Sequence, residues 1–439
     1  MSQTAAASAS VGRMTRYRWV VMAIIFVFYT ITYADRANIG VVLPRIQSEF
    51  KLSNFEAGSL ASLFFVGYSL TQIPAGLWYG RFGVRGLISF AMVVTSIFTG
   101  LIGTSGSAAM VKLYRFGLGL AEGPGGPGVA STINNWFPPK EKGTATGIFI
   151  AATKFAPVLV PPITVWIMLA SGWRQVFFWF AVPGFVMAAV WHLFVRNYPH
   201  ESPFCSPAEA AYIKETGSAA RTAAIEPKRS LGWLDRLIRA KKVPPLTTNR
   251  EVFTSWNMWA NTTGCFMVIS VIYGLLTWIP SYLVKAKHFT FMQMGFVAST
   301  PWVGAVLGSL VGGVVSDKVL AKRRKPLMLL GAVATMGMMG ALIGAPADKT
   351  VIALLLLLTG FVLSLGYPLY TAYPMGLATA KTFPVASSLV NTGGNLGGFF
   401  APMLAGYLLD QFGYNAVFTY FGVCAALCLI VVATMEEPI

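Results

Sequence analysis

The sequence contains few charged residues: Asp, Glu, Lys and Arg together make up 11% of its 439 residues. A typical soluble domain carries about 25%, so this composition excludes an ordinary soluble protein. Hydrophobic residues make up 55%, and the mean hydropathy is +0.63. The composition therefore predicts an all-α membrane protein that crosses the bilayer many times.

Residues that build metal and thiol sites are also scarce. The sequence has three His and four Cys, and no two cysteines have the paired spacing of a metal site. Cys265, Cys424 and Cys428 lie in apolar runs, where we expect small packing residues and not disulfides. The Gly-x4-Gly-Lys-Ser/Thr phosphate loop is absent, as is any nucleophile–base constellation. We therefore expect neither ATP-driven transport nor an enzyme, and no cofactor.

Acidic residues are fewer than basic ones: the sequence has 16 Asp and Glu against 33 Lys and Arg, which gives a net charge of +17. The basic residues are dispersed in short polar gaps, which argues against a nucleic-acid partner and is typical of the positive-inside rule. We expect a monomeric, multi-pass protein of the bacterial inner (cytoplasmic) membrane with both termini cytoplasmic. The residues that set this orientation are Arg13, Arg16, Arg18, Arg81, Arg85, Lys140, Lys142, Lys318, Lys322, Arg323, Arg324 and Lys325.

Twelve apolar runs are each long enough to cross about 30 Å of hydrocarbon as a helix. The longest polar stretch divides them six and six. The sequence thus predicts an N-terminal six-helix bundle (residues 1–196), a cytoplasmic linker (197–250) and a C-terminal six-helix bundle (251–439). The predicted spans cover approximately residues 17–44, 56–79, 85–104, 108–136, 142–169, 174–196, 252–283, 292–316, 325–345, 350–378, 384–409 and 414–434.

Within the linker, the segment Leu231-Gly-Trp-Leu-Asp-Arg-Leu-Ile-Arg239 places its apolar side chains on one helix face. Such a segment suits a short amphipathic helix at the membrane surface, with Trp233 at the interface and Arg236 and Arg239 near lipid headgroups. A plain solvated linker is the alternative.

Five charged residues lie deep inside the apolar runs, away from their ends: Asp35, Arg36, Arg115, Glu122 and Lys154. A charge in hydrocarbon is costly, so such residues usually face a cavity or a partner and mark a functional site. A buried ion pair that only fixes helix packing is the alternative. Arg115 and Glu122 are seven residues apart, on nearly the same helix face and about 10 Å apart along the axis. Asp35 and Arg36 are adjacent and diverge by about 100°, so one faces the cavity and the other a neighbouring helix.

Lys154 adds a third cation to the central region. If it lines the cavity, three cations oppose two acids, a balance that suits an anion and favours a second carboxylate on the substrate. The alternatives are a lysine whose ammonium group reaches the interface, or one paired with Glu122.

Uncharged polar residues supply further candidates for substrate binding. Asn391 and Asn395 are one helical turn apart and share a face, where their amides can bind hydroxyls or carboxylates without adding charge. Tyr68, Gln72 and Tyr370 are weaker candidates, because such residues at helical spacing more often pack or anchor helices.

Corresponding positions in the two halves carry similar motifs. Gly76-Leu-Trp-Tyr-Gly-Arg-Phe-Gly-Val-Arg85 closes the second run, and Gly313-Val-Val-Ser-Asp-Lys318 closes the eighth. Such parallel repeats are typical of transporters made of two halves. The first motif resembles the G-x-x-x-D-R-x-G-R signature of the major facilitator superfamily, although Gly80 replaces the usual Asp. The resemblance implies gating roles for Gly76, Arg81, Arg85 and Asp317.

Four further motifs make the resemblance more specific. They are Tyr33-Ala-Asp-Arg-Ala-Asn38, Arg115-x6-Glu122, Asn134-Asn-Trp-Phe137-Pro and Asn391-Thr-Gly-Gly-Asn395. Together they resemble the anion:cation symporter family, which includes hexuronate, galactonate and glucarate transporters and phthalate-type carriers. This resemblance implies Asp35 and Glu122 as proton-binding acids, and Arg36 and Arg115 as substrate-carboxylate or coupling residues.

The sequence therefore predicts a proton-coupled symporter that imports a small organic anion, such as a sugar acid or another mono- or dicarboxylate, by alternating access. Aromatic acids remain an alternative substrate, and sodium-coupled or exchange transport an alternative mechanism. Alternatives from other functional classes are a multidrug exporter and a sensor that binds its ligand without transporting it. The positive excess of buried charge argues against an exporter of cations.

Overall fold

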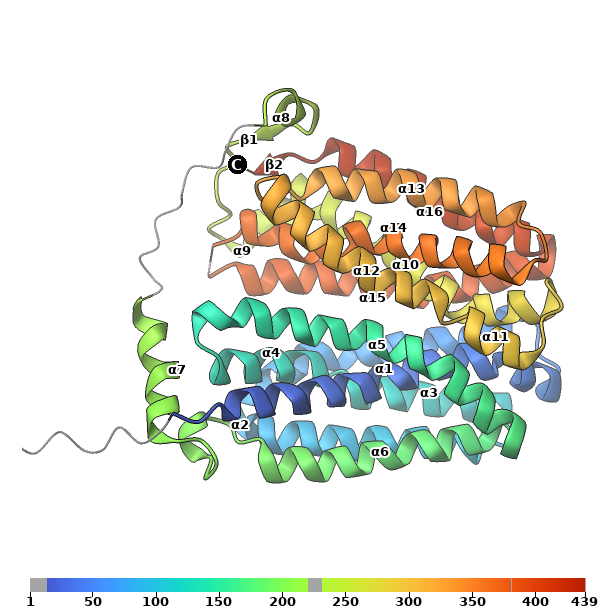
Figure 1. Ribbon diagram of the computed structural model, residues 1–439, viewed down its shortest axis with the longest axis horizontal. Helices are drawn as coiled ribbons and strands as arrows, with labels where there is room; N and C mark the ends of the chain where they lie inside the picture. The colour runs from blue at the N-terminus through green and yellow to red at the C-terminus, as the bar shows by residue number, and fades with distance from the viewer. Residues whose placement is uncertain (1–13, 220–230, 380, 439) are drawn as a thin grey trace, which may run out of the picture.

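The computed structural model describes residues 14–219, 231–379 and 381–438. Arg13, named above, lies outside these ranges. Two helical bundles lie side by side, and the axes of their helices are roughly aligned with one another (Figure 1). Short elements from the middle of the chain lie at one end of the bundles, which we call the linker end; we call the opposite end the far end.

Glycine and proline interrupt the helices of the first bundle at two places. The second and third predicted spans are the two arms of α2, which meet at a kink where Gly83 has a non-helical φ of +68°. A side chain there would be strained, and a Cβ would lie 2.5 Å from Asn197 Oδ1. The fourth span breaks at Gly123 and Pro124. The helices are α1 (Tyr17–Phe50), α2 (Asn54–Gly103), α3 (Ala108–Glu122), α4 (Gly125–Trp136), α5 (Pro139–Ser171) and α6 (Trp173–Phe194).

The second bundle repeats this arrangement, and its second span is broken into two helices. Its elements are α10 (Trp256–Lys285), α11 (Phe291–Val297), α12 (Thr300–Val314), η3 (Val315–Val319), α13 (Lys325–Ile343), α14 (Lys349–Ala372), η4 (Tyr373–Gly376), α15 (Phe383–Phe412) and α16 (Tyr414–Thr434). Within the described ranges, nine helices are long and apolar enough to cross a membrane by themselves. The other crossings are the first part of α2, the broken pair α3 and α4, and the polar, glycine-rich α15. The predicted all-α membrane fold of twelve spans is confirmed.

The linker holds more structure than the sequence predicted. Its elements are η1 (Pro199–Glu201), α7 (Pro207–Ala219), α8 (Trp233–Leu237), β1 (Ala240–Lys241) and α9 (Asn249–Thr254). A short helix does form in the segment 231–239, and its Trp233 and Leu237 are 74% and 67% exposed. Ile238, which the amphipathic pattern placed on the same face, is instead buried.

The first half of the linker is attached to the first bundle through Glu209 on α7. Its carboxylate accepts hydrogen bonds from the backbone N–H groups of Tyr17 and Arg18 at 2.9 and 3.1 Å, and from the Arg18 guanidinium at 2.8 Å. It thereby caps the N-terminus of α1. Burial raises the pKa of Glu209, but the hydrogen bonds from Thr15 and Arg18 outweigh burial and hold that pKa below its usual value.

The second half of the linker is attached to the other bundle. Asp235 on α8 pairs with Arg323 at 2.9 Å. Strand β1 pairs in parallel with β2 (Glu437–Pro438), so the linker also contacts the end of the chain. Each half of the linker therefore has its own anchor on the bundle beside it.

Candidate functional site

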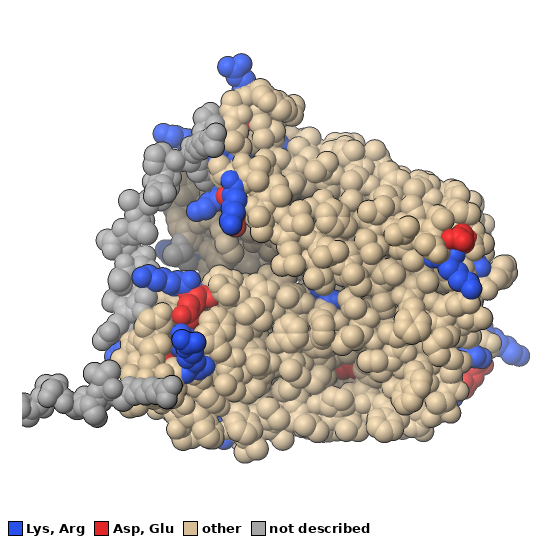
Figure 2. Space-filling model, in the orientation of Figure 1, with Lys and Arg blue, Asp and Glu red and all other residues tan. Residues whose placement is uncertain are grey.

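The two bundles meet along α2 and α15, which touch from the far end to the middle of the molecule. A Cβ at Gly58 would lie 2.3 Å from the carbonyl oxygen of Pro402, so only glycine permits this approach. About four turns further along α2, Asn395 donates from Nδ2 to Gln72 Oε1 at 3.1 Å. Towards the linker end, the surface is hollowed between the bundles (Figure 2). Gln72 and Asn395 therefore join the two bundles at the inner limit of their close contact.

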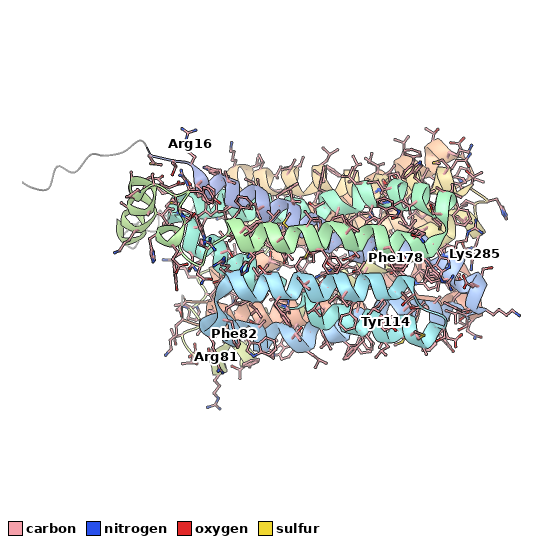
Figure 3. The ribbon with its side chains drawn as sticks, turned by 90° about the horizontal axis from the view of Figure 1, so that it is seen from below. Arg16, Arg81, Phe82, Tyr114, Phe178 and Lys285 are labelled. Carbon is pink, nitrogen blue, oxygen red and sulfur yellow. The ribbon has the colours of Figure 1, made fainter. Side chains whose placement is uncertain are left out.

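Polar contacts hold the bundles together at the far end. Asp410 on α15 accepts hydrogen bonds from the backbone N–H groups of Asn54 and Phe55 at 2.9 and 2.8 Å, and from Asn54 Nδ2 at 2.8 Å. It thus binds the N-terminus of α2 from the opposite bundle. Lys285 donates to Gln47 Oε1 at 2.6 Å across the same boundary. Lys285 lies at the end opposite Arg16 and Arg81 (Figure 3). The molecule is therefore closed at the far end and hollowed at the linker end.

Arg36 lies at the centre, between acidic and aromatic groups. Its Nε donates to Glu122 Oε2 at 3.0 Å, and its Nη1 contacts the hydroxyl of Tyr273 on α10 at 3.5 Å. The rings of Tyr33 and Tyr68 lie 4.6 and 4.4 Å from its guanidinium carbon. The side chain thus reaches from the first bundle to the second, and its role in substrate binding stays a prediction.

Arg115 has a different environment from the one expected for a substrate ligand. It is 2% exposed, and it donates to the main-chain oxygens of Asp35 at 3.0 Å and Leu60 at 3.3 Å. These bonds join α1, α2 and α3. Glu122, seven residues later, pairs with Arg36 and not with Arg115. Asp35 is 3% exposed and lies inside the first bundle, so the adjacent Asp35 and Arg36 do point in different directions.

Lys154 on α5 is 5% exposed, and its Nζ lies 4.6 Å from the ring centre of Tyr367 on α14. Among the described residues, no acid pairs with Lys154 and no group hydrogen-bonds to it. The two alternatives in which it reaches the interface or pairs with Glu122 therefore do not describe this structure. A buried cation held only by an aromatic ring is poorly compensated and favours the approach of an anion.

The remaining predicted binding residues are divided between two environments. Asn391 is exposed on α15, one turn from Asn395, and Tyr68 is beside Arg36. Tyr370 lies elsewhere: it is 1% exposed, with its hydroxyl 2.9 Å from Cys428 Sγ, inside the second bundle. Its assignment to the central site is therefore wrong, because its ring packs against Gly264 of α10 and its hydroxyl is turned to Cys428.

The predicted gating residues lie towards the linker end, and the contacts that the described side chains of Arg85 and Asp317 make stay within one bundle. Arg85 donates through Nε to the carbonyl oxygen of His192 at 2.7 Å, which ties it to α6. Asp317 pairs with Arg324 at 2.8 Å inside the second bundle. Arg81 is exposed, and Gly76 lies within α2. Their gating role stays a prediction.

Sequence reasoning missed two parts of the arrangement. Tyr273 was not a candidate, although it is a partner of Arg36 from the other bundle. Asp410 was also overlooked, because an acid at the end of an apolar run is indistinguishable from an ordinary surface residue. In the described chain, the hydroxyls of Tyr33, Tyr68 and Tyr367 make no hydrogen bond to protein, which leaves them available for a ligand.

Comparison with known proteins decides the family. Residues 25–400, and a second segment covering residues 351–438, match the family model for the Major Facilitator Superfamily. The chain belongs to this superfamily. Membership confirms the prediction of a multi-pass membrane transporter and not an enzyme.

Relatives within the superfamily carry more specific names. A probable galactarate/D-glucarate transporter of Pseudomonas putida is 31% identical, covering 92% of this chain and 88% of its own. A probable galactarate/D-glucarate transporter of Escherichia coli is 28% identical, covering 94% and 93%. A probable sulfoacetate transporter of Cupriavidus necator is 28% identical, covering 96% of each chain.

A solved structure shares the superfamily fold. That of a D-xylose-proton symporter matches with a TM-score of 0.73 over 96% of this chain and 98% of its own, at 16% identity. At this identity the likeness supports the fold alone.

Proposed function

We propose that the protein is a proton-coupled symporter for a small organic dianion, of which a sugar diacid such as galactarate or glucarate is the preferred example. The observation that carries this proposal is Lys154, a buried cation with no acidic partner among the described residues. Arg36 is paired with Glu122, so when Glu122 takes up a proton Arg36 becomes a second unmatched positive charge beside Lys154. A substrate with a negative group at each end matches this arrangement.

In the proposed complex, one carboxylate binds the Arg36 guanidinium, whose planar donors suit bidentate recognition. The other carboxylate binds the Lys154 ammonium. Galactarate and glucarate carry a carboxylate at each end, and sulfoacetate carries a carboxylate and a sulfonate, so the names of these three relatives support a doubly charged substrate. The free hydroxyls of Tyr33, Tyr68 and Tyr367 are suited to the hydroxyl groups of a sugar acid.

Coupling and movement complete the proposal. Glu122 and Asp35 bind protons, and Arg115 positions α1 against them. The bundles (residues 1–196 and 251–439) rock about the site as units joined by residues 197–250. The linker end and both chain termini are cytoplasmic, and the protein is a monomer of the bacterial inner membrane. Gln72, Asn391 and Asn395 bind the substrate from facing helices. Gly76, Arg81, Arg85 and Asp317 close the linker end in the opposite state.

The test is the change Lys154→Gln, assayed with glucarate and its monocarboxylate counterpart gluconate in proteoliposomes. Loss of one charged hydrogen bond is worth about 1.5–3 kcal/mol, so the preference for glucarate should fall roughly ten- to a hundredfold. Lys349→Gln, at an exposed lysine of α14, is the matched control and should leave the preference unchanged.

An equal loss for both substrates would contradict the role of Lys154 in binding a second carboxylate. If that equal loss came with a shifted pH dependence of uptake, Lys154 would belong to the coupling network. Uptake that depends on sodium and not on a proton gradient would contradict proton coupling.

A further inference from the structure

Two neighbouring residues of α1 carry buried polar atoms that the fold leaves without protein partners. Asn38 is 0% exposed, and neither its Oδ1 nor its Nδ2 has a hydrogen-bond partner in the described parts of the chain. One carboxylate oxygen of Asp35, Oδ1, is also buried without a hydrogen-bond partner in the described residues. The two residues are three positions apart, which places them about 60° apart around the helix and about 4.5 Å apart along it.

A third orphaned group lies beside them. Thr99 on α2 is 1% exposed, and its hydroxyl lies close enough to the Asp35 carboxyl to act on it, although the two do not meet in good hydrogen-bonding geometry. The charged groups that act on Asp35 are Glu122 and Arg115 from α3 and Arg36 from α1. The Arg36 side chain, however, points towards Tyr273 and the second bundle. Asp35 and Thr99 therefore lie together inside the first bundle, with Asn38 about one helical turn from Asp35 on α1, and we refer to these three residues as the polar cluster.

Buried polar atoms of this kind destabilise the fold unless they have hydrogen-bond partners. A buried amide or hydroxyl without a hydrogen bond costs about 1–3 kcal/mol, and native proteins pair nearly all such groups. Buried water makes about three hydrogen bonds to groups of this kind. The carboxyl, amide and hydroxyl of Asp35, Asn38 and Thr99 supply both donors and acceptors, which suits water. A metal cation would use only the oxygens and would be repelled by Arg115.

We propose that Asn38 and Thr99 hold ordered water against the Asp35 carboxyl, so that Asp35 gains and loses its proton inside the N-terminal bundle and not through the substrate site. Asn38 is then a positioning residue for proton coupling. This inference rests on the proposed coupling role of Asp35, but its first test needs no substrate.

The first test is infrared spectroscopy of the purified protein during a pH titration. Asp35→Asn should remove one carboxylic-acid C=O band, which assigns that band to Asp35. Asn38→Leu keeps a similar volume but removes the amide, so the band should move to higher frequency as its hydrogen bonding weakens. Its pH midpoint should rise by about one unit, because water no longer stabilises the carboxylate.

Two further variants separate water binding from packing. Asn38→Ser retains a polar group and room for water, and should keep the band near its original position. Thr335→Val removes a buried hydroxyl that also lacks a partner, but in the second bundle, and should leave the Asp35 band unchanged. If Asn38→Leu fails to fold, Thr99→Val supplies the same measurement from the other side of the cluster.

The second test uses proteoliposomes with glucarate as the probe. Asn38→Leu should reduce uptake driven by a pH gradient about tenfold relative to exchange at equal pH, because only driven uptake needs the proton to be exchanged. A protein that does not carry glucarate would defeat the proposed substrate but leave the infrared result to decide this inference.

Three results would overturn the proposal. One is the absence of an Asp35 band that Asp35→Asn removes, and another is a band that Asn38→Leu and Thr99→Val leave unchanged. The third is a band that disappears on adding sodium at constant ionic strength, which would assign the cluster to a cation.

Discussion

Glu122→Gln is expected to abolish accumulation of substrate against its gradient while exchange of labelled for unlabelled substrate at equal pH continues. Glu122 is 4% exposed and accepts a hydrogen bond from Arg36 Nε at 3.0 Å, while its Oε1 is buried without a partner in the described chain. Glutamine preserves the size of the side chain and an oxygen for Arg36, but it cannot take up or release a proton. Gradient-driven uptake should therefore fall to the level of empty liposomes, measured with a labelled diacid under an imposed pH gradient.

The matched control is Glu49→Gln. Glu49 also pairs with an arginine, Arg174 at 2.6 Å, but at the exposed far end within the first bundle. Surface pairs of this kind contribute little to stability, so driven uptake should stay near that of the unchanged protein. If the Glu122 variant still concentrated substrate, Glu122 would be a structural partner of Arg36 and Asp35 would carry the coupling alone.

Asp410→Ala is expected to shift the protein towards the conformation that is open at the far end. The Asp410 carboxylate accepts three hydrogen bonds from Asn54 and Phe55 across the bundle boundary. These bonds stabilise only a state in which the far ends of α2 and α15 touch. Allowing for their exposure to solvent, their loss should cost about 1.5 kcal/mol or more, which changes the ratio of the two states about tenfold.

The measurement is the distance distribution between spin labels at Lys140 and Lys318, which are exposed at the linker ends of the two bundles. The short-distance population should grow in Asp410→Ala. Asp348→Ala is the matched control, because Asp348 accepts a hydrogen bond from the backbone N–H of Val351 at 2.9 Å and caps α14 within a single bundle. Equal distributions in the two variants would show that Asp410 contributes only to helix capping.

Two motifs that the sequence marked only by resemblance have a structural role at the linker end of the first bundle. The sequence placed Gly83 in a signature loop, and the structure explains it by a positive φ and the close approach of Asn197. The neighbouring motif Asn134-Asn-Trp-Phe137 was treated as a mark of resemblance. In the structure it connects the end of α4 to the segment after α6. Asn135 Nδ2 and Trp136 Nε1 donate to the carbonyl oxygens of Asn197 and Arg196 at 3.1 and 2.9 Å. Both motifs shape the junction of α2, α4 and α6.

The sequence by itself determined the number and approximate position of the spans and the presence of charges inside them. Both follow from local costs: a helix needs about 20 apolar residues to cross the bilayer, and an ionisable residue within such a run needs a partner or a cavity. Tertiary structure decided which partner each charge has. Glu122 is paired with Arg36 and not with Arg115, Lys154 lies against Tyr367, and Asp410 binds the start of α2. These choices depend on how each helix is rotated and packed against helices far away in the chain, which no single segment encodes.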